Sequence, residues 1–158
     1  MAENLALALG ARARVYIDTS VLVCAFSNEP LQAVALALLQ APQWDQVCAS
    51  DWTVAEFTCA MQAKVLRGET PPEVAHTIHQ NVKSLFTQGA LNRIAVLRED
   101  YAAVQRIVPS LNCLIRGADA LHLAVASRSS ITHFASLDKT QRITAGHWLR
   151  GIECVPKV

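Results

Sequence analysis

The stretch Arg14-Val15-Tyr16-Ile17-Asp18-Thr19-Ser20 decides how this sequence of 158 residues is interpreted. Its first part, up to Ile17, is rich in β-branched and aromatic residues and runs directly into Asp18, a pattern typical of a buried strand. Thr19 and Ser20 then offer hydroxyl groups that favour the start of a helix. The stretch therefore predicts a strand that passes directly into a helix, with a carboxylate at the junction.

The same alternation of short β runs and helical segments continues along the rest of the chain. Further strands are expected at 46–49, 92–97, 131–135 and 151–155, and helices at 21–26, 31–40, 51–67, 70–86, 98–108, 117–128 and 138–148. This order predicts an α/β fold, a three-layer α/β/α sandwich with a mostly parallel central sheet. No internal repeat or linker interrupts it, so we expect a single domain over residues 14–158, preceded by a flexible tail over residues 1–13.

Composition limits the classes of function. Hydrophobic residues make up 52% of the chain and charged residues 17%, which favours a packed core over disorder. The formal net charge of +1 excludes a strongly basic surface, so binding to nucleic acid would depend on a local arrangement of charge. The start of the sequence lacks the pattern of a signal peptide, and no segment is long enough to span a membrane, so a cytoplasmic protein is expected.

The cysteines argue against a structural zinc site. There are five, an odd number, and no pair has Cys-x-x-Cys spacing. We expect reduced and mostly buried thiols in a reducing compartment.

Four acidic residues are placed where ligands bind in parallel sheets, which is outside the carboxyl ends of the strands. Asp18 follows the first strand and Asp138 lies just past the fourth. Glu56 lies in the second turn of the helix that follows the second strand, and Asp119 in the first turn of the helix after Arg116. All four side chains are therefore expected on one rim of the sheet.

Each acid has an ordinary structural explanation when it is considered alone. Asp18 and Asp138 are suitable helix caps, Asp119 suits the positive end of a helix, and Glu56 suits a solvated helix surface. Their joint placement points to chemistry, because two carboxylates about 4 Å apart repel by about 4 kcal/mol at an effective dielectric constant near 20. A cluster of four is expected to need a cation, and oxygen ligands suit Mg²⁺ or Mn²⁺.

Four segments of the sequence resemble the PIN-domain family and, within it, the VapC-type toxins of toxin–antitoxin pairs. They are YIDTSVLV at Tyr16–Val23, SDWTVAEF at Ser50–Phe57, RGADALHLAVA at Arg116–Ala126 and HFASLD at His133–Asp138. The third segment is fairly specific for the family, and the order of all four is the stronger indication. The resemblance covers nearly the whole chain after the tail.

The resemblance implies a function and a set of site residues. Asp18, Glu56, Asp119 and Asp138 match the family's acidic residues that bind Mg²⁺ or Mn²⁺, and Ser20 matches a small hydroxyl residue that supports the site. The implied activity is endonucleolytic cleavage of RNA. For the VapC branch, the resemblance also implies a homodimer that a cognate antitoxin inhibits.

On this basis we assign expected roles. Asp18, Glu56 and Asp119 would hold the first metal ion, and Asp138 would complete the site or hold a second ion when RNA is bound. Thr19 or Ser20 would orient a carboxylate or a metal-bound water, with a helix cap as the alternative for Ser20.

Arg116 would meet a substrate phosphate, with an intramolecular or solvated ion pair as the alternative. Further cations considered for a phosphate track are Lys64, Arg67, Arg128, Lys139 and Arg142, each of which also suits an ordinary solvated surface position. His122 is read as a packed, hydrogen-bonded histidine rather than as a metal ligand.

Two other functions stay open at this stage. One is a catalytically inactive PIN-like module that binds RNA or a protein. The other is a phosphotransfer enzyme with Asp18 as the nucleophile. Such enzymes usually carry a second acid two residues further on, where this chain has Ser20.

Overall fold

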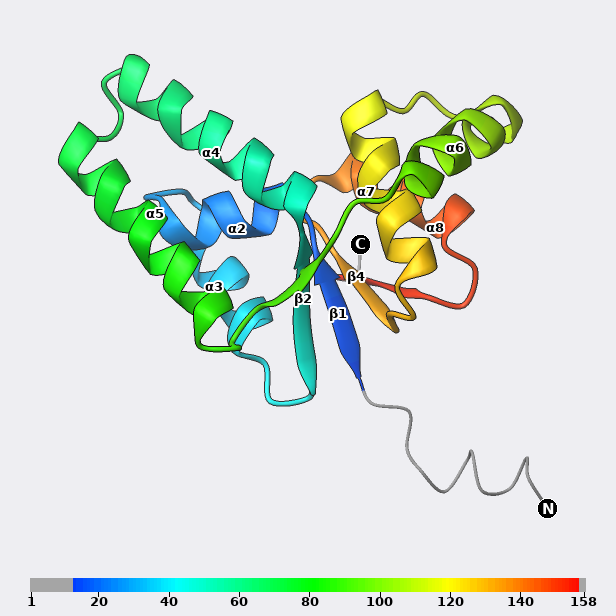
Figure 1. The fold of residues 1–158 in the computed structure, drawn as a ribbon, viewed down its shortest axis with the longest axis horizontal. Helices are drawn as coiled ribbons and strands as arrows, with labels where there is room; N and C mark the ends of the chain where they lie inside the picture. Colours follow the sequence, from blue (N-terminus) through cyan, green and yellow to red (C-terminus); the bar gives the residue numbers. More distant parts are fainter. Residues whose placement is uncertain (1–12, 157–158) are drawn as a thin grey trace.

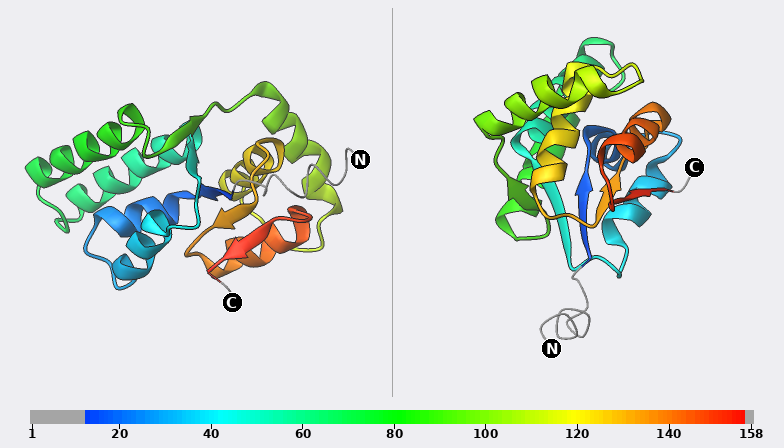
Figure 2. Two further views of the ribbon diagram at one scale, coloured as in Figure 1. Left: turned by 90° about the horizontal axis from the view of Figure 1, so that it is seen from below. Right: turned by 90° about the vertical axis from the view of Figure 1, so that its right-hand side faces the viewer.

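Five parallel strands form the centre of the computed structural model, which describes residues 13–156. The strands are β1 (Arg14–Ile17), β2 (Gln46–Ser50), β3 (Asn92–Ile94), β4 (His133–Ala135) and β5 (Glu153–Val155). They lie in the order β3-β2-β1-β4-β5, and every neighbouring pair is parallel. The left view of Figure 2 shows β3 at one edge of the sheet and β5 at the other. The tail predicted over residues 1–13 lies outside the described residues, apart from Ala13.

Helices cover both faces of this sheet (Figure 1). They are α2 (Thr19–Phe26), α3 (Gln32–Gln40), α4 (Asp51–Leu66), α5 (Pro72–Thr87), α6 (Arg98–Ile107), α7 (Gly117–Arg128) and α8 (Lys139–Trp148), with a short 3-10 turn at Val108–Ser110. In Figure 1, α2 to α5 lie on one side of the strands and α6 to α8 on the other. The predicted three-layer α/β/α architecture is confirmed, and the sheet is parallel throughout the described part of the chain.

Strand β1 shows why the core has two halves. Val15 and Ile17 point into an apolar cluster with α2 to α5, whereas Tyr16 points into a second cluster with α6 to α8. Successive residues of a strand face opposite sides of a sheet, and all three side chains are buried because helices cover both sides. A central strand covered on both faces therefore appears in the sequence as a continuous apolar run.

The edges of several elements differ from the predicted ones. The strand expected over residues 92–97 ends at Ile94. Beyond it, the backbone oxygen of Ala95 accepts a hydrogen bond of 2.8 Å from Arg128, and Leu97 already serves as the N-cap of α6.

The expectation of mostly buried thiols was wrong, because only two of the five cysteines, Cys24 and Cys48, are buried. Between residues 13 and 156, no helix combines the length and apolar character that a membrane crossing requires.

Candidate active site

A cavity of about 260 Å³ lies at the carboxyl end of the sheet and brings the four predicted acids together. It is lined by Asp18, Thr19, Ser20, Glu56, Ala60, Asp119, His122 and Asp138. These residues come from the β1–α2 junction, from α4, from α7 and from the start of α8. Acids that are up to 120 positions apart in the numbering thus border one space, because the strands all run in the same direction.

Asp18 is both the N-cap of α2 and part of the cavity wall. Its Oδ1 atom accepts hydrogen bonds from the backbone N–H of Ser20 at 3.0 Å and from the hydroxyl of Ser20 at 2.5 Å. Burial raises the pKa of Asp18 above its ordinary value, although His122 and the hydroxyls of Ser136 and Ser20 counteract this rise. A carboxylate held in this way has a fixed orientation, and the hydroxyl two residues on leaves no acid to assist attack by Asp18 as a nucleophile.

Glu56 reaches the cavity from the second turn of α4, which begins with a reciprocal cap between Ser50 and Thr53. Its Oε2 atom accepts hydrogen bonds from Thr19 Oγ1 at 2.5 Å and from His122 Nε2 at 2.7 Å. Burial alone would raise the pKa of Glu56, but the hydrogen bonds from His122 and Thr19 outweigh it and lower the pKa. Glu56 is therefore held as a carboxylate, with one oxygen already occupied.

Asp119 and Asp138 also line the cavity. Asp138 is the N-cap of α8, where its Oδ1 accepts a hydrogen bond from Gln141 N at 3.1 Å. The side-chain amide of Gln141 donates to the backbone oxygen of Asp119 at 3.0 Å and links the two segments. Burial and the negative charge of Asp138 raise the pKa of Asp119, while Arg116 works in the opposite direction. The charge of Asp138 therefore disfavours the anionic form of Asp119.

The donor set suits a divalent cation. Four carboxylates offer the hard oxygen ligands that Mg²⁺ and Mn²⁺ prefer, and a cation would relieve the repulsion that raises the pKa of Asp119. Within residues 13–156, however, no three His, Cys, Asp or Glu side chains lie in an arrangement that could hold a metal ion as they stand. Ion binding would thus require some of the acidic side chains to move toward one another, and repulsion between bare carboxylates opposes that movement until a cation is present.

The cations considered for a phosphate track are mostly engaged elsewhere. Lys64 is paired with Glu29, Arg67 with Glu69, and Arg128 with the buried Asp100, while Arg142 donates to the backbone oxygen of Ser136. Lys139 is exposed at the start of α8, next to the cavity residue Asp138.

Among the cations considered, Arg116 best fits the predicted contact with a substrate phosphate. It is exposed at the N-cap of α7, and its charge acts on Asp119. No ion pair of Arg116 is present among the described residues, which disfavours the alternative of an intramolecular salt bridge.

Three buried polar residues in or next to the cavity were not identified as site residues from the sequence. They are Tyr16, Ser50 and His122, and they are linked by hydrogen bonds. His122 was expected to be a packed, hydrogen-bonded histidine, and it is buried and hydrogen-bonded to Glu56, a partner that the sequence did not predict. The only signal for it was its position three residues after Asp119, which places both side chains on a similar face of one helix.

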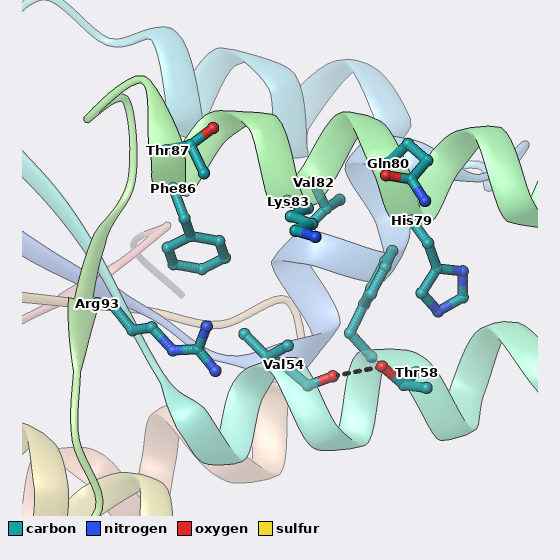
Figure 3. Close-up of a pocket in the computed structure, with 10 residues that line it drawn as sticks. Val54, Thr58, His79, Gln80, Val82, Lys83, Phe86, Thr87 and Arg93 are labelled. Atoms are coloured by element: carbon teal, nitrogen blue, oxygen red, sulfur yellow. Dashed lines mark hydrogen bonds between the residues drawn. The ribbon is translucent and has the colours of Figure 1, made fainter.

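A second and more apolar depression lies between α4 and α5 (Figure 3), with a volume of about 360 Å³. Val54 and Thr58 of α4 face Val82 and Phe86 of α5 there, and Arg93 of β3 borders one end. This groove contains no carboxylate, whereas the cavity at the sheet edge contains four. The acidic cavity is therefore the candidate active site.

Comparisons with known proteins identify the family and the fold. The family model described as PIN domain matches residues 15–146. The fold resembles that of VapC20 from Mycobacterium tuberculosis, described as a sarcin-ricin loop cleaving toxin, with a TM-score of 0.66, 13% identity and coverage of 88% of this chain and 98% of that chain.

Two further solved structures show the same fold. FitAcB from Neisseria gonorrhoeae gives a TM-score of 0.63 at 18% identity, covering 89% of this chain and 95% of that chain. VapBC2 from Rickettsia felis, solved with a promoter DNA fragment, gives 0.62 at 13% identity, covering 89% and 96%. No curated protein sequence matches the chain.

Proposed function

Because this chain belongs to the PIN-domain family, whose VapC members are nucleases, we propose that it is a metal-dependent endoribonuclease that cleaves RNA phosphodiester bonds. The observation that carries this proposal is the convergence of Asp18, Glu56, Asp119 and Asp138 on one cavity. The cofactor is Mg²⁺ or Mn²⁺, held first by Asp18, Glu56 and Asp119. Asp138 completes the site or holds a second ion when RNA is present.

A bound divalent ion supplies charge neutralisation at the phosphodiester and lowers the pKa of an attacking water. The chain's own residues supply orientation. Ser20 and the start of α2 fix Asp18, and Thr19 and His122 fix Glu56, so that neither carboxylate needs to be ordered during the reaction. Arg116 meets a phosphate of the RNA, which a guanidinium binds well.

The same proposal includes partners and context. The chain acts as the toxin of a toxin–antitoxin pair in the cytoplasm, as a homodimer that a cognate antitoxin inhibits. The support is that VapC20 is described as a toxin and that two other similar structures, VapBC2 and FitAcB, are complexes with antitoxins. The cleavable RNA is single-stranded or looped, as the resemblance to the PIN nucleases implies.

The test is cleavage of an end-labelled single-stranded RNA by the wild type and by Asp119→Asn, with Mn²⁺ or with a chelator. We expect cleavage by the wild type only with Mn²⁺, and a loss of at least about 100-fold in the variant, because a ligand is replaced by a neutral amide. Glu73→Gln removes an exposed acid at the start of α5 and serves as the control.

Two outcomes would contradict the proposal. Equal cleavage by the wild type and Asp119→Asn, or cleavage that the chelator leaves unchanged, would exclude the mechanism. Binding of RNA without cleavage at any Mn²⁺ concentration would favour the inactive PIN-like module instead.

A further inference from the structure

A chain of buried hydrogen bonds runs behind the candidate active site and ends on Glu56. The Tyr16 hydroxyl lies 2.7 Å from Ser50 Oγ and 2.8 Å from His122 Nδ1, and His122 Nε2 lies 2.7 Å from Glu56 Oε2. The four residues come from β1, β2, α7 and α4. These hydrogen bonds therefore join the middle of the sheet to two helices that carry proposed metal ligands.

These polar groups lie in the protein interior, where the loss of one partner is costly. Tyr16 and Ser50 are 0% exposed and His122 is 2% exposed. The Tyr16 ring stacks on Phe134 and meets the His122 ring edge-on, so apolar packing alone would hold both rings in place. Burying a hydroxyl and an imidazole at these positions costs desolvation that an apolar core would avoid, so we infer a role for these groups beyond packing.

The direction of the hydrogen bonds can be assigned from the partners. A carboxylate only accepts, so Nε2 of His122 carries the proton that is donated to Glu56. In that tautomer Nδ1 accepts from Tyr16, whose pKa is raised by burial, so that the phenol keeps its proton. The Ser50 hydroxyl then donates to Tyr16, while its oxygen accepts from the backbone N–H of Thr53 at 3.1 Å. Every member has a complementary partner.

The last hydrogen bond of this series, from His122 to Glu56, determines which oxygen of Glu56 is available. Oε2 is occupied by His122 and by Thr19, whereas Oε1 accepts no hydrogen bond from residues 13–156. His122 also lies one turn after Asp119 on α7, so that a single helix carries one proposed ligand and the partner of another. Fixing Oε2 in this way leaves a single oxygen of Glu56 for an ion.

We propose that His122, held in its tautomer by Tyr16 and Ser50, is a positioning residue that presents Oε1 of Glu56 to the metal ion. This inference rests on the proposed function, because it gives Glu56 the role of a metal ligand. Hydrogen-bonded partners behind a metal site commonly change metal affinity by about 10- to 100-fold when they are removed.

The test measures Mn²⁺ affinity by calorimetric titration of the RNA-free protein. Tyr16→Phe removes one oxygen and keeps the ring on Phe134, and we expect binding about 10-fold weaker. His122→Leu removes both bonds, and we expect a loss approaching about 100-fold. His122→Gln restores an N–H donor near Nε2 and should bind Mn²⁺ better than His122→Leu.

The controls remove the same groups elsewhere. Tyr101→Phe, at a half-exposed position on α6, and His76→Gln, on the exposed face of α5, should leave the Mn²⁺ affinity unchanged. Thermal unfolding of the metal-free variants separates a positioning role from a structural one. A lower melting temperature combined with unchanged Mn²⁺ affinity would overturn the proposal, and if His122→Leu does not fold, Tyr16→Phe decides.

The outcomes also distinguish this inference from the function on which it rests. If Mn²⁺ binding depends on Asp119 but is the same in wild type and Tyr16→Phe, the positioning role is wrong and the nuclease proposal stands. If the wild type does not bind Mn²⁺ at all, both are wrong. In cleavage assays, a positioning role predicts that Tyr16→Phe recovers most of the wild-type kcat at saturating Mn²⁺.

Discussion

The hydroxyl oxygen of Ser20 accepts a hydrogen bond from the backbone N–H of Leu137 at 2.8 Å, although 117 positions separate the two residues in the sequence. The same hydroxyl donates to Asp18 Oδ1 at 2.5 Å. One side chain therefore connects the acid at the end of β1 with the loop that leads from β4 to Asp138. This hydroxyl is therefore one of the groups that fix the position of Asp18 relative to Asp138.

The substitution Ser20→Ala tests this connection. It leaves the Leu137 N–H without its acceptor, so we expect a loss of about 1–3 kcal/mol in the free energy of unfolding, measured with urea. Ser84→Ala, at an exposed position of α5, should change stability by less than about 0.5 kcal/mol. If Ser20→Ala is as stable as Ser84→Ala, the hydroxyl does not hold the two segments together.

The half-buried Asp119 also predicts a pH dependence of the metal-free protein. The pKa of Asp119 is raised by burial and by Asp138, so the folded state binds more protons than the unfolded state between the ordinary and the raised pKa. The free energy of unfolding contributed by this residue therefore falls as the pH rises through that range. Asp119→Asn removes the contribution, so the variant should become more stable than the wild type with increasing pH.

Urea unfolding at several pH values from about 4 to 7 measures this difference. Glu56, whose lowered pKa acts in the opposite direction, is present in both proteins, so the comparison reports Asp119 together with its coupling to Glu56. If the difference in the free energy of unfolding between the wild type and Asp119→Asn stays constant with pH, the raised pKa of Asp119 is wrong. Adding Mn²⁺ should reverse the order, because the ion stabilises only the protein that binds it.

The sequence predicted the meeting of the acids for a simple reason. Asp18 and Asp138 follow parallel strands, and the carboxyl ends of parallel strands share one edge. Helix periodicity also separates Glu56 from the buried Phe57 and Met61 on α4. Local patterns of this kind show on which face and at which end of a helix or strand an acid lies. These two properties were enough to predict that the four acids meet at one edge of the sheet.

The same patterns do not encode which side chain is the partner of another. Tyr16 and His122 are 106 positions apart, and each is equally compatible with simple core packing. Arg128 shows the same limit, since an arginine in the last turn of a helix suits a phosphate contact or an ion pair equally well. Only the three-dimensional structure places the buried Asp100 beside it.

This ion pair gives a third prediction. Arg128 Nε and Nη2 donate to the two carboxylate oxygens of Asp100 at 2.8 and 2.9 Å, and Asp100 is 1% exposed. Arg128→Met would leave a buried carboxylate without its cation, at a cost of about 3–5 kcal/mol in the free energy of unfolding. Arg106→Met, on the exposed side of α6, is the matched control.

RNA binding provides the contrasting readout for Arg128. Since the guanidinium is engaged by Asp100, the folded fraction of Arg128→Met should bind single-stranded RNA as the wild type does. A large loss of RNA affinity without a loss of stability would instead return Arg128 to the phosphate track.

Arg116 is expected to behave in the opposite way. It is exposed, and its positive charge lies close enough to Asp119 to oppose the rise in the pKa of that acid. If it contacts one phosphate of single-stranded RNA, Arg116→Ala should reduce the slope of log affinity against log salt by about 0.7, with little change in stability. Arg150→Ala, an exposed cation after α8, is the control and should leave this slope unchanged. Equal salt slopes for wild type and Arg116→Ala would exclude a phosphate contact, because release of a counterion accompanies every such contact.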